Sequence, residues 1–273
     1  MDTGYGDRDV LLHRFTSACE ADNRVVAAFL GGSLASGKAD AYSDLDIYAI
    51  TTDDAYDDFV GQRRAFLRLL GQPVFLEDYN VFGFDMVWFT FADGVEGELA
   101  FARESSFEHI HGGPYEVLVD KKGLLAGKTF PLYQPSEEDQ LRTLRQAIYW
   151  FWEHLSHFIT GMHRKQPWTA YGSLDEARMK VLKLVRLAHD FTTEQSAYSG
   201  IEQVVPKEEM LPLEATCCTL EPHAMLEAAL VLVRVYRQVA RELAAQHGIE
   251  YPTALESVIL RRLDALRSVW PAC

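Results

Sequence analysis

The chain has 273 residues, of which 48% are hydrophobic and 24% are charged, and its formal net charge is −14. This composition is typical of a globular protein with one large domain or two smaller ones. The negative charge argues against a nucleic acid as the main partner, because affinity for a nucleic acid backbone comes from clustered Lys and Arg side chains. The charge suits a cationic small-molecule substrate, and solubility alone would also explain it.

No apolar run is long enough to cross a membrane, and the acidic, polar first residues do not have the pattern of a secretory signal. The four cysteines lack the Cys-x-x-Cys spacing of a zinc site. They are Cys19, Cys217, Cys218 and Cys273. We therefore expect a cytoplasmic protein with reduced thiols and no membrane partner.

The first half of the chain alternates between helical and strand patterns. Apolar residues at helical spacing mark helices, and runs of branched and aromatic residues mark strands. Asp93-Gly94, between two such runs, indicates a tight hairpin turn. The predicted helices are 7–21 and 53–70, and the predicted strands are 25–30, one that carries Asp44 and Asp46, 74–77, 84–91, 95–103 and 115–119.

The second half of the chain is predicted to be helical. A stretch at about 127–135, with two prolines and no periodicity, predicts a domain boundary. We expect 197–220 to be irregular because it contains Pro206 and Pro212. The predicted helices are 136–163, capped by Ser136, 174–191, capped by Ser173, 221–247 and 253–269. A mixed sheet followed by four helices indicates an α+β or α/β domain and a helical bundle.

The stretch from Leu30 to Ile50 carries the clearest functional pattern. Gly31 and Gly32 allow a ligand to approach the backbone closely, and Ser33 offers a hydroxyl and an amide to an anion. Asp44 and Asp46 would project from one face of a strand, where two carboxylates repel each other unless a cation lies between them. Oxygen ligands of this kind suit Mg²⁺, so the pattern indicates a metal–nucleoside triphosphate site. The alternative is a solvated turn with two surface aspartates.

Gly32-Ser33 followed by Asp44-Leu45-Asp46 resembles the motif of the polymerase-β-like nucleotidyltransferase superfamily. The block GGSLASGKADAYSDLDIYAI, the strand VEGELAFAR and the helical second half are similar to the antibiotic nucleotidyltransferases, closest to the lincosamide type. The resemblance covers nearly the whole chain. It implies an α+β protein with a mixed-sheet nucleotidyltransferase domain, residues 1–130, and a C-terminal helical bundle domain, residues 131–273.

The resemblance also implies a reaction and its residues. AMP from ATP would be transferred to a hydroxyl of a small-molecule antibiotic, most simply a lincosamide, with release of pyrophosphate. The alternatives are an aminoglycoside acceptor of the streptomycin type, another metabolite or a macromolecule. Asp44 and Asp46 would hold two Mg²⁺ ions, and Glu98 would be the catalytic base, with Glu96 as second choice and edge-strand charges as the structural alternative. The expected nucleotide-binding residues are Gly32, Ser33 and Lys38.

The helical half offers weaker candidates. Arg178, Lys180 and Lys183 could hold the triphosphate, although solvated surface charge is the commoner role. The aromatic and imidazole side chains that could line an acceptor pocket, with core packing as the commoner role, are Tyr149, Trp150, Trp152, His154, His157 and Trp168. The apolar helix 221–247 is either a homodimer face or core.

Overall fold

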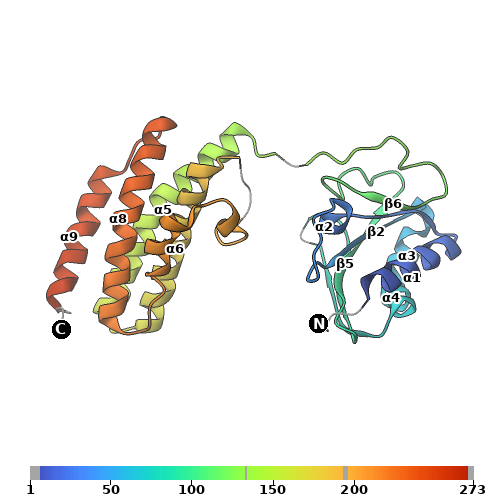
Figure 1. The fold of residues 1–273 in the computed structure, drawn as a ribbon, viewed down its shortest axis with the longest axis horizontal. Helices are drawn as coiled ribbons and strands as arrows, with labels where there is room; N and C mark the ends of the chain where they lie inside the picture. Colours follow the sequence, from blue (N-terminus) through green and yellow to red (C-terminus); the bar gives the residue numbers. More distant parts are fainter. Residues whose placement is uncertain (1–6, 81, 133, 193–195, 270–273) are drawn as a thin grey trace. The chain divides into compact units, whose positions relative to one another are not determined.

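The structure, a computed structural model, describes residues 7–80, 82–132, 134–192 and 196–269. The chain divides into two compact units, Met1–Tyr133 and Gln134–Cys273 (Figure 1). The first unit contains a mixed sheet with helices, and the described part of the second contains helices without strands. The predicted α+β class is therefore confirmed. The predicted boundary at residue 130 lies close to this division. That the two units are independent domains stays a prediction.

The first unit is built on a six-stranded sheet with the strand order β3-β4-β5-β2-β1-β6. Strands β2 and β5 pair in parallel, and the other neighbouring strands pair antiparallel. The elements, in chain order, are α1 (Arg8–Ala21), β1 (Val25–Leu30), α2 (Gly32–Ala35), β2 (Leu45–Thr51), η1 (Asp53–Ala55), α3 (Tyr56–Gly61), α4 (Arg63–Leu70), β3 (Pro73–Tyr79), β4 (Met86–Phe91), β5 (Glu96–Arg103) and β6 (Glu116–Asp120).

The two faces of this sheet are covered differently. Helices α1, α3 and α4 pack on one face, where Phe15, Phe59 and Phe101 belong to one buried cluster (Figure 1). On the other face, the segments before and after β6 cover only one end, where Phe130 from the segment after β6 stacks on Phe29 with ring centroids 5.2 Å apart. The other end of that face carries Asp46 and the polar residues beside it.

The second unit is a helical bundle arranged around α5. Its elements are α5 (Glu137–His163), α6 (Pro167–His189), η2 (Ile201–Gln203), α7 (Lys207–Glu214), α8 (Pro222–Gln246) and α9 (Thr253–Val269) (Figure 1). Phe151 of α5 stacks on Tyr236 of α8 with ring centroids 3.9 Å apart, and the Tyr236 hydroxyl donates a hydrogen bond to the carbonyl of Ile148. The apolar side chains of α8 fill this core, so its composition is explained by packing. A homodimer stays a prediction.

Several predicted elements differ from those observed. The predicted helix 53–70 is broken at Gln62, which follows Gly61, a weak helix former. Helix α6 begins at Pro167 rather than at Leu174 after a Ser173 cap, because proline is well suited to the first helical turn. The segment predicted to be irregular contains α7, which has Pro212 inside it.

Two further predictions concern membrane-spanning helices and the cysteine thiols. None of the helices in the described ranges has both the length and the apolar character needed to cross a bilayer. Cys19, Cys217 and Cys218 are free thiols, and Cys273 lies outside the described residues.

Candidate active site

The turn between β1 and α2 lies directly against Asp46. Gly32 has φ +62°, a left-handed conformation that disfavours residues with a side chain. A Cβ atom added to Gly32 would lie 1.7 Å from Oδ2 of Asp46, and the amide of Gly31 donates to the carbonyl of Asp46 at 2.8 Å. Glycine is therefore required here for both backbone conformation and space.

Ser33 follows Gly32 as the second residue of the four-residue helix α2. Its hydroxyl oxygen is buried and has no hydrogen-bond partner, which is unusual for a buried polar atom. A phosphate oxygen is a suitable acceptor for such a hydroxyl. Lys38 is exposed, and its backbone amide donates to the carbonyl of Ser33 at 2.9 Å, which places this lysine on the same short loop.

Asp46 and Glu98 are direct neighbours on the parallel strands β2 and β5. Burial, then the charges of Asp44 and Glu98, raise the pKa of Asp46 from its ordinary value of 3.8 to about 6. Asp44 is exposed and immediately precedes β2, so it is not part of the strand in which it was predicted. The three acidic residues therefore come together at one end of the open sheet face, although Asp44 does so from a loop.

These carboxylates fit a divalent cation by their chemistry. Among the described residues, Asp44, Asp46 and Glu98 form no salt bridge, so no side chain balances their charge. Carboxylate oxygens are the protein ligands that Mg²⁺ prefers. No three His, Cys, Asp or Glu side chains of the described residues are arranged as a complete metal site, so the two aspartates as ligands stay a prediction.

Arg8 of α1 holds the loop that leads into Asp44, and sequence reasoning missed this residue. Its guanidinium donates to the carbonyls of Ser43 and Asp40 at 2.5 and 2.6 Å. The side chain of Asp40 in turn accepts from the amide of Tyr42 at 2.8 Å. These contacts fix the backbone just before Asp44.

Three ring side chains were also missed: Tyr48 and Tyr79 lie near Asp46 and Glu98, and His111 contacts Tyr48. Burial and the charges of Asp46 and Glu98 raise the pKa of Tyr48, and burial and Glu98 raise that of Tyr79. Nε2 of His111 lies 3.0 Å from the carbonyl of Pro114 and must donate to it, so its Nδ1 accepts from the Tyr48 hydroxyl at 3.2 Å. Burial lowers the pKa of His111, which favours this neutral form.

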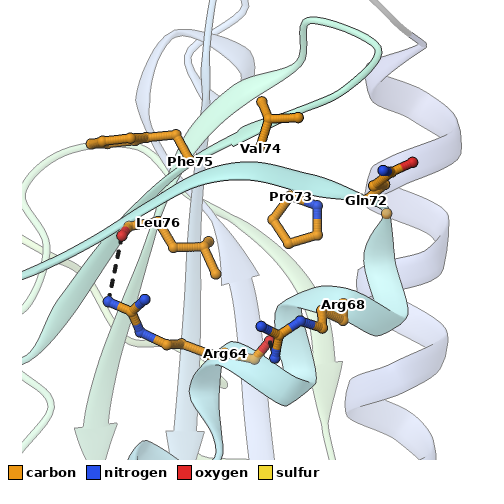
Figure 2. Close-up of a pocket in the computed structure, with 8 residues that line it drawn as sticks. Arg64, Arg68, Gln72, Pro73, Val74, Phe75 and Leu76 are labelled. Carbon is orange, nitrogen blue, oxygen red and sulfur yellow. Dashed lines mark hydrogen bonds between the residues drawn. The ribbon is translucent and has the colours of Figure 1, made fainter.

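A pocket on the first unit lies away from these residues. Figure 2 shows Arg64 and Arg68 of α4 facing the start of β3, around a cavity of about 520 Å³. Arg64 donates to the carbonyl of Leu76 and pairs with Asp78, a carboxylate that it shares with Arg63. None of the predicted site residues lines this pocket.

The candidates in the helical unit separate into core and surface. Arg178 is only 5% exposed and donates to Oγ1 and the carbonyl of Thr216, so it supports the fold. Trp152 is buried against Tyr236, whereas Trp168 is 76% exposed. Lys180 and Lys183 line a cavity of about 500 Å³ between α5 and α6, together with Trp150.

The raised pKa of Asp46 gives a testable effect on stability. Between pH 4 and 6 the folded chain binds more protons at Asp46 than the unfolded chain, so the contribution of Asp46 to wild-type stability falls as the pH rises through this range. We expect Asp46→Asn, which carries no charge, to unfold at a higher temperature than wild type above pH 6 in EDTA, and at a similar temperature near pH 4. Thermal unfolding at both pH values measures this. Equal stability at pH 7.5 would contradict the unfavourable charge of Asp46.

Comparison with known proteins supplies the family. Residues 7–265 match the sequence model of the family described as streptomycin adenylyltransferase. The crystal structure of an aminoglycoside 6-adenyltransferase from Bacillus subtilis is similar at 15% identity and a TM-score of 0.43, over 93% of this chain and 97% of that one. A nucleotidyltransferase-like protein from Exiguobacterium sibiricum is similar at 10% identity and a TM-score of 0.36, over 85% of this chain and 75% of that one. No curated protein matches the sequence.

Proposed function

Because the chain belongs to the streptomycin adenylyltransferase family, we propose that it transfers AMP from ATP to a hydroxyl group of an aminoglycoside, with release of pyrophosphate. The family places the chain among the nucleotidyltransferase enzymes. The expected lincosamide acceptor has no support from this match, which favours the aminoglycoside alternative. The net charge of −14 agrees with a polycationic acceptor. The cytoplasm, which supplies ATP, is the compartment that this reaction requires.

The observation that carries this proposal is the pairing of Asp46 with Glu98 beside the Gly32-Ser33 turn. Asp44 and Asp46 would hold Mg²⁺, which when bound neutralises charge on the triphosphate. Ser33 and the backbone of the turn would hold phosphate oxygens, and Lys38 would reach them from the adjoining loop. These groups would fix the α-phosphorus close to Glu98.

Glu98 would act on the acceptor as a general base. Its carboxylate takes the proton from the acceptor hydroxyl, whose oxygen forms a bond to the α-phosphorus. The bond between that phosphorus and the bridging oxygen breaks, and pyrophosphate leaves with the bond's electrons. Glu98 suits this role because it is half-buried on a rigid strand and forms no salt bridge among the described residues.

The proposal is tested by incubating the purified chain with ATP, Mg²⁺ and single antibiotics. We expect pyrophosphate release and a product heavier by one adenylate group with streptomycin or a related aminoglycoside. Lincomycin and clindamycin serve as the lincosamide comparison, and EDTA serves as the metal control. Modification of lincosamides alone, or of none of the compounds, would contradict an aminoglycoside acceptor.

A further inference from the structure

One row of side chains crosses the open face of the sheet and extends beyond the groups assigned to the chemistry. Asp46 pairs with Glu98, Glu98 pairs with Trp88 of β4, and Trp88 pairs with Glu77 of β3. Directly opposed residues on neighbouring strands share a face of the sheet. With strands about 4.8 Å apart, Trp88 and Glu77 lie about 5 and 10 Å from Glu98 across the sheet.

Trp88 is an exposed aromatic side chain on an inner strand. It is 44% exposed, and it makes an edge-to-face contact with Phe75, which is 43% exposed, at a centroid distance of 5.2 Å. Phe75 extends away from Arg64 and Arg68 in Figure 2, so it contributes to this surface as well as to the rim of that pocket. Aromatic rings left open beside polar groups are typical of ligand-binding surfaces.

On this face of the sheet, the charged side chain directly beside the aromatic pair is Glu77, which pairs with Trp88. Glu77 is exposed, and it forms no salt bridge with any described residue. The nearby arginines Arg63 and Arg64 both pair with Asp78, whose side chain projects to the opposite face of β3. An aromatic ring face beside an unpaired carboxylate attracts a cation.

We propose that Trp88, Phe75 and Glu77 form the acceptor subsite, in which a cationic ring of the aminoglycoside lies on Trp88 with its charged group directed at Glu77. This proposal rests on the proposed function. It orders the site along one row: the phosphate-binding turn and Asp46 on one side, Glu98 in the middle, and the acceptor on the other side. A hydroxyl of the bound acceptor then faces Glu98 from the side opposite the nucleotide.

The test separates acceptor binding from nucleotide binding. Trp88→Ala and Glu77→Gln are each expected to raise the KM for streptomycin at least tenfold, while the KM for ATP stays within twofold of wild type. Trp88→Phe, which keeps an aromatic face, should recover most of the loss. Glu116→Gln removes the same charge from the exposed edge strand β6 and should leave both KM values unchanged, which controls for the overall charge.

Calorimetric titration of each folded variant with streptomycin should give the weakest binding for Trp88→Ala and Glu77→Gln, stronger binding for Trp88→Phe, and wild-type binding for Glu116→Gln. If Trp88→Ala fails to fold, Glu77→Gln decides the question, because Glu77 is exposed and glutamine has the same shape as glutamate. An unchanged streptomycin KM in Glu77→Gln, or an equal loss in Glu116→Gln, would overturn the subsite. Failure of the wild-type chain to adenylylate any aminoglycoside would instead overturn the proposed function, so the two failures are distinguishable.

Discussion

Glu98→Gln is expected to lower kcat at least about a hundredfold with little change in the KM for ATP. Glutamine has the same shape as glutamate but cannot take the proton from the acceptor hydroxyl. The variant should fold, because the substitution removes a charge that Asp46 meets unfavourably across the β2–β5 pair. Steady-state adenylylation rates and thermal unfolding of the same preparations measure the two effects.

Glu96→Gln is the matched control for this prediction. Glu96 lies on the same strand and the same face, two residues before Glu98, but it is exposed and pairs with Thr90 rather than Trp88. We expect its kcat to stay within a few-fold of wild type. Full activity in Glu98→Gln, together with loss in Glu96→Gln, would assign the base to Glu96.

Gly32→Ala is expected to reduce activity about a hundredfold by moving Asp46. The new Cβ would lie 1.7 Å from the carboxylate oxygen of Asp46, so the carboxylate must shift or the turn must open. The left-handed conformation of Gly32 adds an unfavourable free energy of about 1 to 2 kcal/mol for any residue with a side chain. Both the loss of turnover and the lower unfolding temperature are measurable on one sample.

Gly123→Ala separates these two causes. Gly123 also has a left-handed conformation, with φ +70°, but a Cβ there meets no atom within 4 Å. This variant should lose a similar amount of stability and keep its turnover. If it lost activity to the same degree as Gly32→Ala, general destabilisation rather than displacement of Asp46 would explain both.

The sequence patterns predicted the sheet, the helical half and the face on which Glu98 lies, because each depends on local periodicity. They could not predict the strand register. Asp93-Gly94 predicted a tight turn, and Phe91 does face Val95 around a three-residue loop in which Gly94 has φ +86°, but the motif alone does not state which residues of the two strands pair. A shift of one residue reverses which face opposes Glu98, so Trp88 could not be assigned to the row from sequence alone.

Other residue roles could not be predicted because they depend on hydrogen bonds between residues that are far apart in the sequence. Arg8 and His111 lie far in sequence from the residues that they position, and no short motif connects them. The sequence around Arg178 is typical of an exposed charge on a helix. In the structure, its guanidinium donates a hydrogen bond to Thr216, which belongs to a separate segment. In each case the hydrogen-bond partner, rather than the residue type, sets the role.

The parallel pairing of β2 with β5 also bears on the order of folding. Helices α3 and α4 and strands β3 and β4 lie between these two strands in the chain. Antiparallel neighbours such as β3, β4 and β5 are joined by short connections, so these strands can pair early in folding. A parallel pair forms later, because the long segment between its two strands must first become ordered. The repulsion between Asp46 and Glu98 therefore arises only when most of the unit has already folded. We expect it to lower the stability of the native state and to have little effect on the folding rate.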